Sequence, residues 1–131
     1  MALQLTGVPA KEAAILVLGN AEGAPILQGG PDDPDGEPAF VIPANRRHTE
    51  IMHLEADPAG PDRRVWAAGA WMHTIGDAAT LRLLDDGGSC AFAADAWEPH
   101  WPQLYRIDAA EADLPIWRAG ETLELSCTYA N

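Results

Sequence analysis

The stretch that decides the fold is Glu121-Thr-Leu-Glu-Leu-Ser-Cys-Thr-Tyr129, near the C-terminus. Apolar and polar residues alternate in it one by one, which is the period of a β-strand with two different faces. The face expected to point into the core carries Leu123, Leu125, Cys127 and Tyr129. The face expected to meet solvent carries Thr122, Glu124, Ser126 and Thr128. A strand of this kind is typical of an antiparallel sheet with one wet side.

Outward from this stretch, the chain repeats short apolar or alternating runs that end at Gly, Pro, Asn and Asp. Helical periodicity over eleven or more residues is absent, and segment 108–114, whose alanines favour a helical turn, is stopped by Pro115. The expected strands are 13–18, 24–28, 39–42, 48–56, 64–74, 79–84, 89–94, 104–109 and 122–129. Short strands at this spacing predict an all-β fold, an antiparallel jelly-roll β-sandwich of about eight to nine strands.

Size and charge limit the classes of function. With 131 residues and 47% hydrophobic composition, the chain can bury one core, and we expect a single domain over residues 1–131. Eight basic against twenty acidic residues give a net charge of -12, which repels phosphate backbones and anionic membrane surfaces. We therefore expect neither nucleic acid nor a membrane as partner. No apolar run approaches the roughly 20 residues that span a bilayer, so we expect a soluble protein.

The termini and the cysteines leave the compartment open. Residues 1–6 lack the basic and apolar regions of a signal peptide, so none is expected there. Cys90 and Cys127 do not form a CxxC pair, which excludes a zinc ribbon and a thioredoxin-type motif. On the residues alone, one long-range disulfide and two buried free thiols are both open, and a disulfide would suit an oxidising compartment.

Four histidines are candidate metal ligands: His48, His53, His73 and His100. A metal site on a sheet is most simply made from His-x-His, because residues two apart project from the same face. In the stretch Gly69–Gly76, Trp71 takes the first of these two places and His73 the second, and an indole nitrogen has no lone pair for a metal. His53 lies on the neighbouring expected strand and could approach His73. Each histidine alone is also compatible with an ordinary surface or core role.

Five tryptophans occur, and such rings usually supply core area. Trp97 and Trp101 flank a proline, which indicates a bend. The alternative is an aromatic platform for carbohydrate, which exposure of these two rings would favour. The sequence has no Gly-x-Ser-x-Gly elbow and no phosphate-binding glycine loop before a helix.

Four segments together resemble the C-terminal catalytic domain of the copper type II, ascorbate-dependent monooxygenases. This is the family of peptidylglycine α-hydroxylating monooxygenase and dopamine β-hydroxylase, and the likeness is to its bacterial members above all. The resemblance is clearest over residues 38–131. The segments are Phe40-Val-Ile-Pro-Ala44, Val65-Trp-Ala-Ala-Gly-Ala-Trp-Met-His-Thr-Ile-Gly76, Trp97-Glu-Pro-His-Trp-Pro-Gln-Leu-Tyr105 and Ala119-Gly-Glu-Thr-Leu-Glu-Leu-Ser-Cys-Thr-Tyr-Ala-Asn131.

The resemblance implies a jelly roll, a disulfide between Cys90 and Cys127, and a copper held by His-x-His and a later methionine. Only His73 matches this ligand set. Trp71 stands in the place of the first histidine, the methionine would fall after Asn131, and Met72 should face away. The family's second copper domain has no counterpart in so short a chain.

We therefore expect a degenerate copper site, with copper bound weakly or not at all, in a non-catalytic or accessory domain. Such a domain would bind a partner protein or a small ligand in a pocket lined by Trp71, Trp97, Trp101 and Tyr105. One alternative is an active copper monooxygenase whose missing ligands come from another chain. His53 and His100 could also rebuild a site with His73. A third possibility is a carbohydrate- or peptide-binding sandwich that uses exposed tryptophans.

Overall fold

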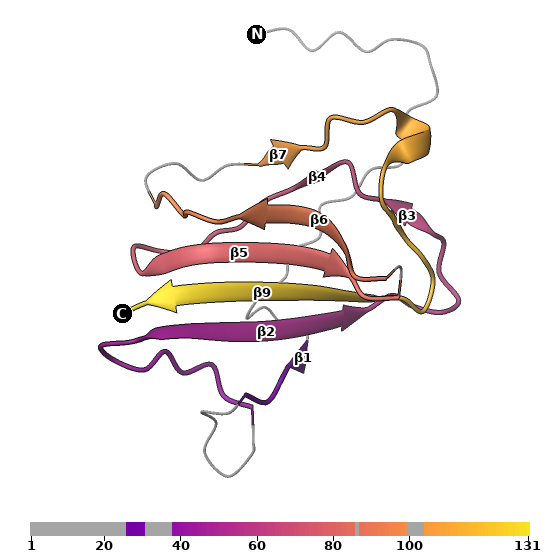
Figure 1. Cartoon of the computed structure of the whole chain (residues 1–131). Coiled ribbons are helices and arrows are strands. Elements are labelled where there is room, and N and C mark those ends of the chain that lie inside the picture. The colour runs from indigo at the N-terminus through magenta and orange to yellow at the C-terminus, as the bar shows by residue number, and fades with distance from the viewer. Residues whose placement is uncertain (1–25, 31–37, 86, 100–103) are drawn as a thin grey trace, which may run out of the picture.

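The computed structural model describes residues 26–30, 38–85, 87–99 and 104–131. Strands make up almost all of its regular structure (Figure 1). They are β1 Ile26–Leu27, β2 Arg47–Glu55, β3 Arg63–Arg64, β4 Ala67–Ala68, β5 Gly76–Leu83, β6 Ser89–Ala94, β7 Tyr105–Arg106, β8 Ile116–Trp117 and β9 Thr122–Ala130. Every described pairing is antiparallel, which confirms the predicted all-β class.

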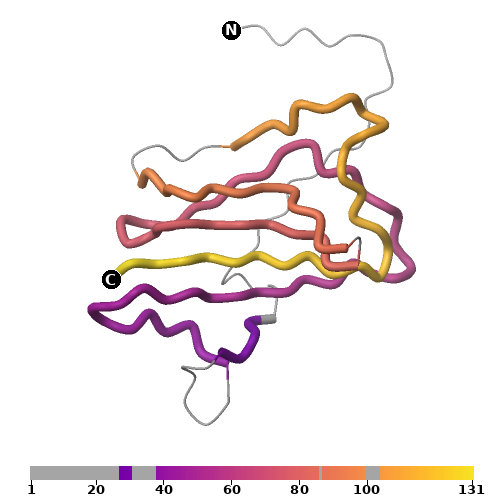
Figure 2. The backbone as a smooth tube through the Cα atoms, viewed as in Figure 1, coloured from indigo at the N-terminus to yellow at the C-terminus, as the bar shows by residue number. Residues whose placement is uncertain are grey.

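The main sheet has five strands in the order β1-β2-β9-β5-β6. Its centre is β9, which pairs along its whole length with β2 and, on its other edge, with β5. Figure 2 shows the C-terminal strand running between chain segments that come much earlier in the sequence. The alternating stretch near the C-terminus is thus the central strand of the main sheet.

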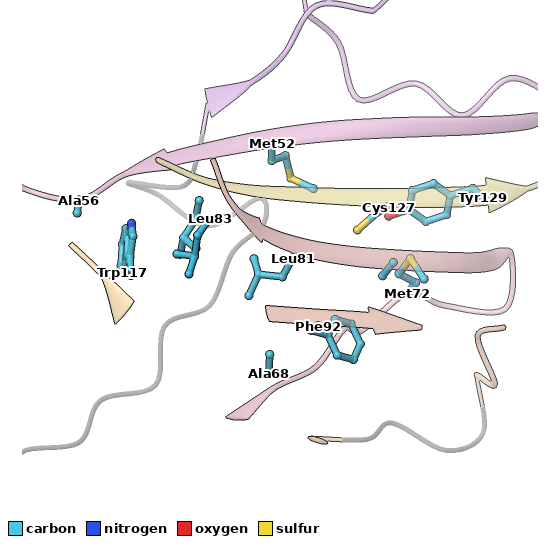
Figure 3. Close-up of a cluster of buried hydrophobic side chains, with 12 residues drawn as sticks. Met52, Ala56, Ala68, Met72, Leu81, Leu83, Phe92, Trp117, Cys127 and Tyr129 are labelled. Atoms are coloured by element: carbon cyan, nitrogen blue, oxygen red, sulfur yellow. The ribbon is translucent and has the colours of Figure 1, made fainter. Parts of the chain in front are cut away.

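Two short ribbons, β3-β8 and β4-β7, lie outside the main sheet. The hydrophobic core joins Ala68 of β4 and Trp117 of β8 to the side chains of one face of the main sheet. Figure 3 shows Trp117 beside Leu83, and Ala68 beside Phe92, within this one cluster. The ribbons therefore pack over one face of the sheet, called the inner face here.

The predicted faces of β9 are confirmed on the inner side. Leu123, Cys127 and Tyr129 are buried, and Leu125 is half-buried and packs against the core. The four residues of the other face are half-buried rather than fully wet. Cross-strand contacts explain this, since the Thr128 hydroxyl lies 2.9 Å from the Thr49 hydroxyl on β2.

The predicted strand 64–74 is broken in the structure. It forms only β3 and β4, and residues 73–75 form a turn before β5. The break has a pairing cause, because the Val65 N–H donates to the Pro115 carbonyl while the Trp66 carbonyl accepts from Ile107 N–H. One short segment thus pairs with two separate parts of the chain. For the same reason the predicted strand 104–109 is reduced to β7.

Other expected elements differ in smaller ways. Residues 39–42 form no strand, and there the Val41 N–H donates to the Glu50 side chain at 3.1 Å. The helical signal in 108–114 produces a single 3-10 turn, η2, over Glu111–Asp113. The expected strand 13–18 and the first two residues of 24–28 lie outside the described residues. Within the described ranges, no helix is long and apolar enough to cross a membrane.

The disulfide that the resemblance implied is wrong: Cys90 and Cys127 are both free. Cys127 on β9 pairs with Ala79 of β5, whereas Cys90 on β6 pairs with Arg82. The two cysteines are two strands apart in the sheet, and their partners on β5 are three residues apart. Their Cα atoms are therefore about 14 Å apart, and a disulfide needs less than about 7 Å. The odd offset also puts the thiols on opposite faces of the sheet, Cys90 exposed and Cys127 buried.

We predict that iodoacetamide modifies the folded protein once, at Cys90, because Cys127 is buried. Both thiols should react in denaturant without added reductant. Mass spectrometry of the adducts measures this, with Cys90→Ser as the control that should remain unmodified when folded. Denatured protein that reacts only after reduction would show a disulfide and contradict this structure.

Candidate functional site

The predicted Trp71–His73 pair lies on the turn that leads into β5. Trp71 is 75% exposed and His73 is exposed too, while Met72 between them is 2% exposed and belongs to the core. Met72 therefore faces away from the other two, as predicted. The two residues at the positions of the expected metal ligands point to solvent from an irregular segment, not from a strand.

Hydrogen bonds hold this turn in place. The His73 carbonyl accepts from the Gly76 N–H at 3.1 Å and from the Trp97 indole N–H at 3.2 Å. The Ile75 carbonyl accepts from the Ala130 N–H at the end of β9 at 2.8 Å. The turn is thus tied both to the central strand and to Trp97.

Gly76 is required by close packing. A Cβ at this position would lie 2.6 Å from the Met72 Cβ and 2.7 Å from Cδ1 of Trp97. Those distances are far inside van der Waals contact, so only glycine lets the turn, Met72 and the indole pack together. Trp97 is accordingly half-buried against the core and acts as a support for the turn.

His53 does not join His73. His53 lies on β2, and its Nε2 is 3.1 Å from a carboxylate oxygen of Glu124 on β9. Gly76 pairs with Tyr129, and Tyr129 pairs with His48, so the turn lies at the end of β2 where His48 is. His53 is five residues further along, about 16 Å at the rise of a strand. His100 lies outside the described residues.

The described residues do not fit a copper centre. In the ranges 26–30, 38–85, 87–99 and 104–131, no three His, Cys, Asp or Glu side chains are placed to hold one metal ion. At the expected position, Trp71 offers no lone pair and His73 contributes a single imidazole.

Three of the four residues of the expected aromatic pocket, Trp71, Trp97 and Tyr105, lie in the described part of the chain. Tyr105 is 46% exposed and its ring lies 5.5 Å from the Phe92 ring, while Trp101 lies outside the described residues. Two hollows in the described part of the chain have volumes of about 290 and 120 Å³. Their lining residues are 85 and 118–121 in the larger hollow, and 28–30 and 48–51 in the smaller. Trp71, Trp97 and Tyr105 line neither.

A buried polar pair on β2 was not among the predicted site residues. His48 Nε2 lies 3.0 Å from Oε1 of Glu50, and the two side chains are only 10% and 5% exposed. The same oxygen accepts the Val41 N–H, so Glu50 also ties segment 38–43 to the sheet. The spacing His48-Thr-Glu50 could have indicated this pair, because residues two apart on a strand share a face.

Cys127 and Tyr129 complete this cluster from β9, opposite Glu50 and His48. Burial raises the pKa of the Cys127 thiol to about 11, with a partly opposing hydrogen bond from Tyr129 and a raising contribution from the charge of Glu50. Burial also raises the pKa of Tyr129, as do its contacts with Cys127 and Glu50. At neutral pH the thiol is therefore protonated and is not a nucleophile. Figure 3 shows the two side chains side by side.

Comparisons with known proteins found no matching family model, no matching curated protein and no matching solved structure. The likeness to the copper monooxygenases thus has only the four sequence segments as its support.

We predict that Gly76→Ala lowers the free energy of unfolding by about 1–3 kcal/mol, because the added methyl group overpacks Met72 and Trp97. Urea denaturation followed by circular dichroism measures this. Thr74→Ala, an exposed change in the same turn, is the control and should stay within about 0.5 kcal/mol of the wild type. Equal stability of Gly76→Ala and the wild type would contradict the packing described.

We also predict a loss of stability at alkaline pH. The Cys127 pKa rises from 9.0 to about 11 on folding, so between these values only the unfolded chain has lost the proton. The stabilisation that the Cys127 thiol gives the folded state is complete below pH 9. It falls by about 2–3 kcal/mol as the pH rises to 11. Denaturation across this range should show a shallower decline for Cys127→Ala than for the wild type. Part of the decline should remain in Cys127→Ala, because folding raises the pKa of Tyr129 as well. If stability fell equally steeply with pH in Cys127→Ala and the wild type, the raised pKa of Cys127 would be contradicted.

Proposed function

We propose that this chain is a non-catalytic binding domain with a jelly-roll β-sandwich similar to the C-terminal domain of the copper type II monooxygenases. The four similar segments support the relationship. An antiparallel main sheet with ribbons packed over one face is compatible with a two-layer sandwich.

The single observation that carries the proposal is the place of Trp71. It stands where the family has its first copper-ligating histidine, and its side chain is 75% exposed. A copper enzyme needs a fixed coordination geometry and an open position for oxygen. One exposed imidazole on a turn supplies neither, so no catalytic step is assigned to this chain.

At the position of this ligand, Trp71 provides a side chain suited to a protein interface. An exposed indole offers a large apolar area with few rotatable bonds, and tryptophan is enriched among residues that dominate protein interfaces. The hydrogen bonds to His73 and Ile75 fix the turn before any partner arrives, which lowers the entropy cost of association. We propose that Trp71 is the anchor for a partner protein.

A copper titration separates this proposal from an active monooxygenase. Isothermal titration with Cu(II) should give no tight stoichiometric binding to the wild type, and His73→Ala should change the heats little. Trp71→His is the matched gain-of-ligand variant. By restoring two imidazoles on the exposed side of the turn, it should raise copper affinity by at least about tenfold, or about 1.4 kcal/mol.

Stoichiometric binding to the wild type that disappears in His73→Ala would overturn the proposal. That result would favour the enzyme whose remaining ligands come from elsewhere in this chain or from another chain.

A further inference from the structure

The two ribbons carry a group of arginines that the function proposed above does not use. Arg63 and Arg64 form β3, Arg106 lies on β7, and all three are exposed. The Arg63 guanidinium lies 5.3 Å from the centre of the Trp117 ring, and Arg64 Nη1 donates to the Glu111 carbonyl at 3.1 Å. Within the described residues, none of the three forms an ion pair with a carboxylate.

This grouping is unusual for so acidic a chain. Acidic residues outnumber basic ones by twenty to eight, yet three of the eight basic residues lie on the ribbon strands. Arg47, by contrast, forms an ion pair, because its Nε is 2.6 Å from an Asp77 oxygen. The net charge of -12 repels anions at long range, but a guanidinium without a carboxylate partner keeps N–H donors for an anion at contact distance, where screening by salt limits that repulsion.

An exposed tryptophan lies between these arginines. Trp66 is 49% exposed and follows Arg64 by two residues, and its carbonyl accepts the Ile107 N–H from the β7 side at 2.9 Å. Arg106 pairs with Ala67, the next residue along. Arg64 and Ala67 are about 10 Å apart along an extended chain, so the backbone positions of Arg64 and Arg106 lie on either side of Trp66.

We propose that Arg64, Trp66 and Arg106 form a binding surface for an acidic polysaccharide, while Arg63 packs on the Trp117 ring and belongs to the other face of β3. A sugar ring presents a flat face of C–H groups that can stack on the Trp66 indole. Uronate carboxylates beside that ring fit the two parallel N–H donors of a guanidinium. An acidic peptide offers carboxylates without an equivalent apolar ring face, so the combination of Trp66 with arginines favours the polysaccharide.

Nearby acidic groups limit the extent of this surface. The Asp62 carboxylate, next to Arg63, accepts the Ala119 N–H at 3.0 Å, which engages one of its oxygens. Asp108 lies two residues after Arg106 and is exposed. The positive strip is therefore narrow, which suits a linear chain of charged sugars better than a broad anionic surface. This inference goes beyond the proposed binding through Trp71 and is independent of copper.

Isothermal titration with polygalacturonate, a linear uronic acid polymer, tests the proposal. The wild type should bind it, and neutral dextran should give no heat. Arg106→Ala and Trp66→Ala should each weaken the affinity by at least about tenfold. The affinity of Arg106→Lys should lie between those of the wild type and Arg106→Ala, because lysine keeps the charge and loses the bidentate hydrogen-bond geometry. The matched control is Arg82→Ala, which removes an exposed arginine from the outer face of β5.

Circular dichroism of each variant shows whether it has folded, and Arg106 and Trp66 are exposed enough that both variants should. Absence of binding by the folded wild type would overturn the proposal. It would also be overturned if Arg82→Ala lost as much affinity as Arg106→Ala. Equal binding of polyglutamate that does not depend on Trp66 would instead identify an acidic peptide as the ligand. None of these outcomes changes the copper titration, so the two proposals fail separately.

Discussion

The structure depends on the pairing of β9 with a long strand on each of its edges. Leu123, Cys127 and Tyr129 point to the inner face because this pairing has one register. A slip of one residue would turn all three outward and bring their polar neighbours into the core. The same register sets Glu50 opposite Cys127 and places the start of β5 beside Tyr129. The buried polar cluster and the Trp71 turn are both consequences of it.

The long strands could be predicted because their signals are local. The alternation in 122–129 and the short segments 48–56 and 79–84, bounded by turn residues, are visible in the sequence itself, and the structure forms β9, β2 and β5 there. The ribbon strands were not predictable in this way. Residues 63–68 pair with β8 and then with β7, and nothing in their own composition signals that change of partner.

The candidate site shows the same division between local and long-range information. The alternation of Trp71, Met72 and His73 correctly predicted that Met72 faces away from the other two. The distance of His53 from the turn and the separation of Cys90 from Cys127 both depend on register, which a single sequence does not contain. The same limit hid the cluster, since His48 and Glu50 are neighbours in sequence while Cys127 and Tyr129 join them only across the sheet.

We propose that His73 is not part of a copper centre, whether its partner would be His53 or His100. Amide spectra of ¹⁵N-labelled protein during a Cu(II) titration test it most directly, because paramagnetic broadening reports every residue near a bound ion. The account predicts gradual broadening scattered over the histidines, without saturation at one equivalent. Selective loss of the signals around His73 together with those of a second histidine, complete at one equivalent, would contradict it.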